Sequence, residues 1–226
     1  MTGMTLYIGN KNYSSWSLRP WLALRHAGAA FEEVVIPLDQ PGTKAAIRRH
    51  SPNGRVPCLV HGDRVVWESL AVCEYAAEIL PDARLWPRDP GLRAYARAIA
   101  TEMHGGFLAL RRALPMDIRS RHALADRLSY CQEDFERVTA IWREARQRFG
   151  GRGAHGPGPF LLGGFCLADA MYAPVTTRFV TYGMPLDDVC AAYVDAVLAL
   201  PAMREWTEAA RAEPWVIDYP APGPAT

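Results

Sequence analysis

The sequence predicts two parts: an α/β domain over residues 4–84 with the order β-α-β-α-β-β-α, and an all-α domain over residues 89–215. Two observations support this division. Short strand-like runs alternate with helical runs up to Glu78, whereas only helical periodicity follows Asp89. The segment 81–87 between them holds turn formers and two prolines, which is typical of a linker.

The elements of the first part follow from its pattern of apolar residues. In order, the pattern predicts a strand around Leu6 and Ile8, a helix at 18–25 closed by Gly28, a strand at 31–36, a helical or irregular stretch at 43–49, a hairpin of 58–60 and 64–67, and a helix from Leu70 that Pro81 ends.

The second part contains apolar residues at intervals of three and four, which predict two long amphipathic helices at 92–114 and 124–149. Within the first of these, Gly105 and Gly106 each cost about 1 kcal/mol relative to Ala in a helix. This pair indicates a kink or the close approach of a ligand. Shorter helices are expected at 168–182, 189–200 and 202–212.

The composition argues against several classes of partner. The chain has 25 Lys and Arg against 24 Asp and Glu, a formal net charge of +1, and no basic stripe that would neutralise phosphates, so nucleic acid is not expected to be the main partner. No apolar stretch approaches the roughly 20 residues that cross a bilayer, and the N-terminus lacks the pattern of a secretory signal. We therefore expect a cytoplasmic protein that does not act at a membrane.

The five cysteines are odd in number and widely spaced. They form no C-x-x-C pair, and the six histidines are dispersed, so no metal site is expected. Reduced and mostly buried thiols are the expected state.

A cluster of hydroxyls marks the start of the first helix. Ser14, Ser15 and Ser17 lie where the positive end of the helix dipole and its free N–H groups favour an anion. A hydroxyl there can also donate to a thiolate and lower its pKa. The alternative is that these serines only cap the helix, for which serine is a favoured residue.

A second motif lies at the entry to the predicted hairpin, in Arg55-Val56-Pro57-Cys58-Leu59. A cis bond before Pro57 would present the backbone of Val56 to a peptide-like ligand. The alternative is an ordinary proline on an edge strand.

A third motif, Glu68-Ser69, stands where the hairpin meets the next helix, with Ser69 expected as the N-cap. A carboxylate beside a hydroxyl and free N–H groups suits the ammonium and carboxylate of an α-amino acid. A plain helix start is the alternative.

In their order and setting, these motifs resemble those of the cytosolic glutathione transferase family. Ser14 to Arg19 (S-S-W-S-L-R) resembles the S-S-C-S-x-R motif of zeta-class members and the S-P-F-x-x-R motif of tau-class members, while V-P-x-L and E-S match the family's cis-proline and γ-glutamyl motifs. The resemblance covers nearly the whole chain and points to a serine-type, zeta- or tau-like bacterial member. It implies a thioredoxin-like first domain, an all-helical second domain, and a cytoplasmic homodimer that serves in detoxification.

Cys166 to Asp169 is similar to the family's [ST]-x-x-D capping box, with Cys166 in place of Ser or Thr. Because cysteine caps poorly, the helix that follows is expected to start less well.

The resemblance also implies roles for individual residues. Ser14 would hydrogen-bond the sulfur of glutathione, the co-substrate, with Ser15 as the second candidate. Glutathione would otherwise be bound by Lys44, Arg55, Val56, Pro57, Glu68 and Ser69. Lys44 and Arg55 could equally be solvated surface charges. The electrophile site would involve Trp16, His104, Phe107 and Arg111, with Met103 and Met116 nearby.

The implied activity is transfer of the glutathione thiolate to a small hydrophobic electrophile, without a metal. Two alternatives stay open, namely a maleylacetoacetate-type isomerase and a non-catalytic glutathione-binding or interaction module. Trp16 stands in place of the cysteine of the zeta motif, which argues against isomerisation. Ser14 stands in place of the cysteine of omega- and beta-like members, which argues against mixed-disulfide chemistry.

Overall fold

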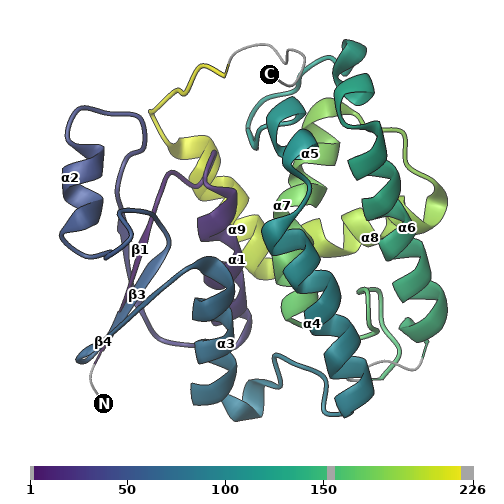
Figure 1. Ribbon diagram of the computed structural model, residues 1–226, viewed down its shortest axis with the longest axis horizontal. Coiled ribbons are helices and arrows are strands. Elements are labelled where there is room, and N and C mark those ends of the chain that lie inside the picture. The colour runs from purple at the N-terminus through teal and green to yellow at the C-terminus, as the bar shows by residue number, and fades with distance from the viewer. Residues whose placement is uncertain (1–2, 152–155, 220–226) are drawn as a thin grey trace.

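The computed structural model describes residues 3–151 and 156–219. The first part has the predicted order of elements and the thioredoxin-like arrangement (Figure 1). Its elements are β1 (Met4–Ile8), α1 (Ser15–His26), β2 (Glu32–Val35), α2 (Thr43–Arg48), β3 (Cys58–His61), β4 (Arg64–Trp67) and α3 (Ser69–Ile79).

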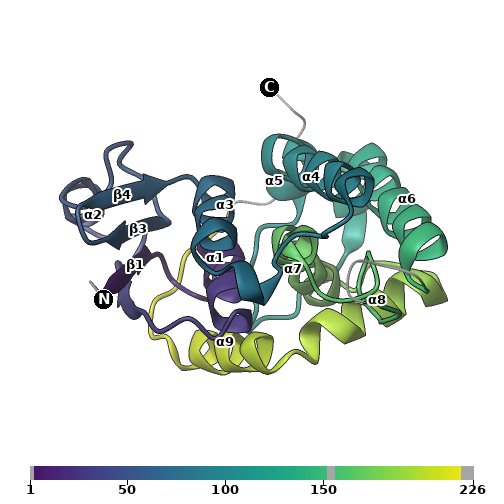
Figure 2. The ribbon, with the colours of Figure 1, turned by 90° about the horizontal axis from the view of Figure 1, so that it is seen from below.

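The four strands form one mixed sheet in the order β2-β1-β3-β4. β1 pairs in parallel with β2 and antiparallel with β3, so that Leu6 lies opposite Leu59. Leu6, Ile8 and Leu59 are fully buried. Helices α1 and α3 lie between the sheet and the helical part of the molecule (Figure 2). The N-termini of both helices therefore lie near the boundary between the two parts.

In the rest of the described chain the regular elements are helices, apart from an isolated β-bridge between Phe160 and Gly163. The helices are η1 (Pro81–Ala83), α4 (Pro90–Gly105), α5 (Leu108–Ala113), η2 (Ala125–Tyr130), α6 (Gln132–Phe149), α7 (Leu167–Tyr182), α8 (Asp188–Leu198) and α9 (Pro201–Ala212). Every residue of α7 except Val180 is buried, which makes α7 the centre of this part. The two parts meet where Trp21 of α1 packs edge-on against Trp206 of α9, with ring centroids 5.0 Å apart.

The two predicted long helices are each divided. The first breaks completely between α4 and α5, where Gly106 is extended and Phe107 has φ of 60°. A Cβ on Gly106 would lie 2.8 Å from the carbonyl oxygen of Glu102, so the break requires glycine at this position. The second begins as the 3-10 segment η2, and Cys131, with φ of −141°, separates it from α6.

The expectation that α7 starts poorly was wrong. The side chain of Cys166 accepts a hydrogen bond from the backbone N–H of Asp169, and the carboxylate of Asp169 accepts one from the N–H of Cys166 at 2.8 Å. Because the whole turn is excluded from water, the weak sulfur acceptor meets no competition from solvent. The capping box is therefore closed.

The five cysteines are free and buried, as predicted. Burial raises the pKa of Cys73 to about 12, which makes this thiol a poor nucleophile. In residues 3–151 and 156–219, no helix is both long and apolar enough to span a membrane.

Candidate functional site

A cavity of about 220 Å³ opens where three segments of the first part converge. Its lining residues are Trp16, Asn53, Arg55, Val56, Pro57, Glu68 and Ser69. They come from the start of α1, from the loop before β3, and from the junction of β4 with α3. The structure thus brings together most of the residues predicted to bind glutathione.

The loop before β3 supplies one wall of the cavity. The Val56-Pro57 bond is cis, as predicted. Val56 precedes β3, and no hydrogen bond joins its backbone to another residue in the described part of the chain. Its N–H and C=O are therefore available to a peptide-like ligand.

The junction of β4 and α3 supplies the opposite wall. Glu68 occupies the N-cap position of α3 with φ of 69°, and Ser69 is the first helical residue, so the prediction of Ser69 as N-cap was wrong. The left-handed backbone at Glu68 costs about 1–2 kcal/mol for a residue with a side chain, and such costs are often met at binding sites. The conformation directs the chain so that both residues line the cavity.

Asn53 connects the two walls. Its side-chain amide donates to Glu68 Oε1 at 2.9 Å, while its Oδ1 accepts from the backbone N–H of Arg55 at 2.9 Å. The sequence marked Asn53 only as part of a Pro-Asn-Gly loop. An asparagine in a turn is expected to hydrogen-bond the backbone of that turn, so the sequence did not predict a partner fifteen residues away.

The start of α1 reaches the cavity through Trp16, whereas Ser14 and Ser15 do not line it. Ser14 is the N-cap, and its Oγ accepts from the backbone N–H of Ser17 at 3.4 Å and donates to Ser17 Oγ at 2.7 Å. Ser14 and Ser15 are each only 5% exposed and lie beside Trp16, which lines the cavity. The hydroxyl of Ser14 thus caps the helix, the alternative that the motif left open, and its proton is directed at another hydroxyl.

A cationic and aromatic cluster surrounds Trp16. The guanidinium of Arg19 lies 4.3 Å from the centroid of the Trp16 ring, that of Arg111 lies 4.8 Å from it, and the ring of His104 packs edge-on at 5.2 Å. Stacking of this kind stabilises both guanidinium groups. Trp16 is therefore held in place from both parts of the molecule.

Arg19 is fully buried, and its Nη1 donates to Ser69 Oγ at 3.4 Å. Its Nε and Nη2 have no hydrogen-bond partner among residues 3–151 and 156–219. Burial, and then the charges of Arg111 and Arg178, lower the pKa of Arg19 well below its ordinary value. The Arg19 guanidinium thus lies against Ser69, the first residue of α3.

His104 reaches from α4 toward the same cavity. Its Nε2 lies 3.9 Å from Glu68 Oε2, and its buried Nδ1 has no hydrogen-bond partner in the described part of the chain. Burial lowers the pKa of His104, the charges of Arg19 and Arg111 lower it further, and only Glu68 opposes them. The lowered pKa favours the neutral imidazole of His104.

The other predicted residues lie further from the cavity. Arg111 donates from Nε to the carbonyl of Gly106 at 3.0 Å and from Nη2 to that of Met103, so it caps the end of α4. Phe107, Met103 and Met116 are buried in the apolar core. Lys44 is exposed on α2 and does not line the cavity.

Among the described residues, no group of three His, Cys, Asp or Glu side chains is placed to hold a metal ion. The cavity lining supplies a hydroxyl, an amide, a carboxylate and a guanidinium group, from Ser69, Asn53, Glu68 and Arg55.

The sequence of the first part is similar to a known protein family. Residues 13–79 match the family model described as "Glutathione S-transferase, N-terminal domain". This span contains every residue that lines the cavity.

Two curated relatives match about half of the chain each. "Probable maleylacetoacetate isomerase" of Caenorhabditis elegans is 35% identical over 105 residues, which cover 46% of this chain and 48% of that protein. "Protein LigF" of Sphingobium sp. is 34% identical over 97 residues, which cover 42% of this chain and 38% of that protein. The matches thus span about half or less of the length of these relatives.

Among solved structures, a glutathione transferase homologue from Burkholderia with bound glutathione is similar over 93% of this chain and 100% of its own, with a TM-score of 0.69. At 24% sequence identity, this likeness shows the fold.

Proposed function

The chain belongs to the cytosolic glutathione S-transferase family, and from this premise we propose that it binds glutathione in the cavity around Val56 and Glu68 and transfers it to a small electrophile. One observation carries the proposal: a free backbone pair, a carboxylate and two helix N-termini converge on one cavity. These are the groups that a γ-glutamyl tripeptide would use.

The residues fit the parts of glutathione. The free N–H and C=O of Val56 suit its cysteinyl backbone, and Glu68 suits its ammonium group. The first-turn N–H groups of α3, with Ser69, suit the α-carboxylate of the γ-glutamyl end. Arg55 is exposed at the rim of the cavity and suits the glycyl carboxylate.

Ser14 would act on the thiol, which supplies the nucleophile when glutathione is bound. In the structure Ser14 Oγ donates to Ser17 Oγ at 2.7 Å. Turning that hydroxyl to a thiolate exchanges a neutral hydrogen bond, worth about 0.5–1.5 kcal/mol, for a charge-assisted one worth about 1.5–3 kcal/mol. The exchange is favourable only for the ionised sulfur, so Ser14 would lower the pKa of the thiol. Ser15 is the second candidate for this role.

The electrophile would lie on the side of the cavity that faces the helical part. Trp16 lines the cavity there, with His104 and Arg111 packed against it. Phe107 contributes to this side only through the buried core. Because Trp16 is an apolar surface between two arginines, a small hydrophobic electrophile with a polar group is the expected substrate.

Glutathione-dependent isomerisation is a second candidate, because a relative over the matched half is named a maleylacetoacetate isomerase. Trp16 stands in place of the zeta-class cysteine, which argues against it.

Calorimetric titration with glutathione, followed by assays with aromatic electrophiles and with a cis-alkene isomerisation substrate, tests these proposals. Binding with conjugation supports transferase activity, and binding with isomerisation alone supports the second candidate. Binding without turnover of any kind supports a non-catalytic module. Absence of binding overturns the proposed site.

We also propose that the protein is a cytoplasmic homodimer that serves in detoxification, as is typical of the family. Val65 and Trp67 are 39% and 41% exposed on β4, the edge strand of the sheet, and offer apolar surface to a second copy. Light scattering of the full chain tests the dimer, and a monomeric mass at micromolar concentration would contradict it.

A further inference from the structure

The loop between β1 and α1 makes a tight turn that ends at Ser14. The carbonyl of Asn10 accepts hydrogen bonds from the N–H groups of Tyr13 at 3.1 Å and Ser14 at 2.8 Å. This turn sets the direction in which the chain enters α1. The position of the Ser14 hydroxyl therefore depends on what holds the turn.

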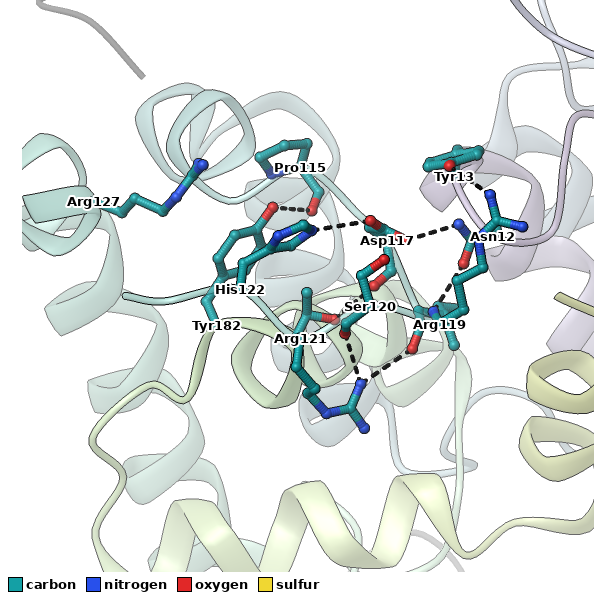
Figure 3. Close-up of polar contacts among 12 residues, drawn as sticks. Asn12, Tyr13, Pro115, Asp117, Arg119, Ser120, Arg121, His122, Arg127 and Tyr182 are labelled. Carbon is teal, nitrogen blue, oxygen red and sulfur yellow. Dashed lines mark hydrogen bonds and ion pairs between the residues drawn. The ribbon is translucent and has the colours of Figure 1, made fainter. Parts of the chain in front are cut away.

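Asn12, inside the turn, is fully buried and points toward the helical part of the molecule (Figure 3). Its side-chain amide donates to Asp117 Oδ1 at 2.8 Å, and its Oδ1 accepts from the backbone N–H of Arg119 at 2.9 Å. Its backbone carbonyl accepts from the N–H of Ile118 at 3.4 Å, and its backbone N–H donates to Glu213 Oε2 at 3.0 Å. Both backbone and side-chain groups of Asn12 are thus paired with residues of the second part.

The usual role of asparagine in a turn does not explain this arrangement. Such a side chain normally bonds backbone groups of its own turn. Here the side chain of Asn12 reaches two residues more than a hundred positions away. The bonds serve to tie the turn to the helical part.

The partners of Asn12 are themselves held firmly. Glu213 also accepts from the N–H of Lys11 at 2.7 Å, and Arg119 donates to the carbonyl of Glu213 at 2.7 Å and to the hydroxyl of Tyr13 at 3.0 Å. The segment after α9 and the loop after α5 therefore close on the turn together, as the dashed lines around Arg119 in Figure 3 show in part.

Asp117 is fixed from several sides. Its Oδ2 lies 3.0 Å from His122 Nε2, and its backbone carbonyl accepts from Thr181 Oγ1 of α7 at 2.9 Å. Burial alone would raise the pKa of Asp117, but hydrogen bonds from Ser120, Asn12 and His122 hold that pKa below its ordinary value. Asp117 is thus an ionised and immobile acceptor, which a positioning contact requires.

We propose that Asn12 is a positioning residue, through which Asp117 and Arg119 of the helical part set the orientation of the Ser14 hydroxyl. The inference rests on the proposed function for its effect on catalysis, while its effect on the turn is independent of glutathione. The two parts of the molecule would then contribute to the reaction in different ways, with one holding glutathione and the other aligning the group that acts on its thiol.

The test exchanges the side-chain amide of Asn12 with the carboxylate of Asp117. Asn12→Asp places two carboxylates about 2.8 Å apart, because the present donor and acceptor have that separation. Asn12→Asp combined with Asp117→Asn restores one amide and one carboxylate, and Asp at position 12 can still accept from Arg119. Asn12→Ala is a second single variant. Arg121→Ala is the matched control, because among the residues that the structure describes the Arg121 side chain donates only to carbonyls of its own loop.

Two readouts are measured on the full chain: kcat with an aromatic electrophile at saturating glutathione, and amide hydrogen exchange of residues 13–18. Asn12→Asp and Asn12→Ala should lower kcat about tenfold or more, as expected when a reacting group is misplaced, while the Kd for glutathione changes less than about threefold. Exchange in 13–18 should accelerate in both. The double exchange should restore both readouts, and Arg121→Ala should match wild type.

Wild-type exchange and kcat in either folded single variant would overturn the proposal, as would a folded double variant that is no better than Asn12→Asp. A wild type that neither binds glutathione nor conjugates it refutes the proposed function instead. Hydrogen exchange then still decides whether Asn12 positions the turn.

Discussion

The N-termini of α7 and α1 are both buried, yet their first turns differ in charge. At α7, the carboxylate of Asp169 accepts from the backbone N–H groups of Cys166 at 2.8 Å and Leu161 at 3.0 Å. At α1, the corresponding positions are Ser14 and Ser17, two neutral hydroxyls that bond each other. The two helices therefore differ in their third residue, which is an aspartate in α7 and a serine in α1.

This difference separates a structural helix start from one suited to a ligand. The positive end of α7 is balanced by a carboxylate of its own first turn. The first turn of α1, Ser-Trp-Ser-Leu, carries no negative charge, so the helix dipole can act on an anion from outside. The predictions below test this contrast.

The largest expected effect is on folding stability, at the N-terminus of α7, where the capping box is closed. Asp169→Asn keeps the shape but replaces one of the two accepting oxygens with an NH2 donor, so one of the two buried N–H groups loses its acceptor and faces a second donor; we expect the free energy of unfolding to fall by about 3 kcal/mol. Urea denaturation measures the loss, and kcat per folded molecule should stay unchanged.

Asp187→Asn provides the matched control. Asp187 caps α8 through a single bond to the N–H of Cys190 at 2.9 Å, and its side chain is 42% exposed. Its replacement should cost about 1 kcal/mol or less. Equal losses at Asp169 and Asp187 would contradict the account of α7.

Asp169 should also make stability depend on pH. Burial raises the pKa of Asp169 from 3.8 to about 6 in the folded protein. Because the folded state holds the proton more tightly, this contribution to stability is complete below about pH 4 and is lost as the pH rises through about 6. From pH 4 to 7, wild type should lose about 3 kcal/mol more than Asp169→Asn does. Parallel pH curves for the two proteins would refute the assignment.

At the N-terminus of α1, whose first turn has no negative charge, the expected effect is on the catalytic rate. Ser14→Ala should lower kcat with an aromatic electrophile by about 30-fold, the equivalent of about 2 kcal/mol, because it removes a charge-assisted hydrogen bond. The Kd for glutathione should change by less than about threefold. The loss of the cap should cost about 1 kcal/mol of stability.

Ser15→Ala is the control for Ser14, since both serines are equally buried and Ser15 lies one residue further into the helix. Its effect on kcat should be smaller. A larger loss in Ser15→Ala than in Ser14→Ala would assign the role to Ser15.

A smaller effect is expected at the cavity wall. Glu68→Gln should weaken glutathione binding about tenfold, equivalent to about 1.4 kcal/mol, with little change in kcat at saturation. The side chain of Glu68 is 43% exposed, so solvent screens part of its charge. Calorimetry measures the change.

Lys44→Ala is the comparison for Glu68→Gln. Lys44 lies outside the cavity lining, so its loss should alter the Kd by less than about twofold. A greater loss of affinity in Lys44→Ala would mean that glutathione extends to α2 and that the cavity wall at Glu68 is not the main contact.

Much of the fold follows from local pattern. The strands and helices of the first part follow the simple periodicity of their apolar residues. The V-P motif lies before β3 and the E-S motif at the start of α3, and both line the cavity. The break at Gly106 could be foreseen only as a kink, because the left-handed conformation of Phe107 depends on packing of its ring in the core. The closed box at Cys166 depends on the exclusion of water, which local sequence does not reveal.

The least predictable features of the candidate site are contacts between residues that are far apart in the sequence. Asn53 pairs with Glu68, and Asn12 with Asp117 and Arg119, through contacts set by how the two parts dock. Periodicity carries no information about such contacts. The motif resemblance predicted most of the residues that line the cavity but not the residues that hold them in place.

The central claim is that the open start of α1 ionises a bound thiol through Ser14. Ultraviolet titration of the thiolate in the glutathione complex tests it most directly, with wild type and Ser14→Ala compared over the same pH range. The account predicts that the bound thiol of wild type titrates at least about one unit below the ordinary thiol pKa of about 8.5, and that Ser14→Ala raises this value toward the ordinary one. A bound thiol that titrates at the ordinary pKa in wild type, or at the same lowered pKa in both proteins, would contradict the claim.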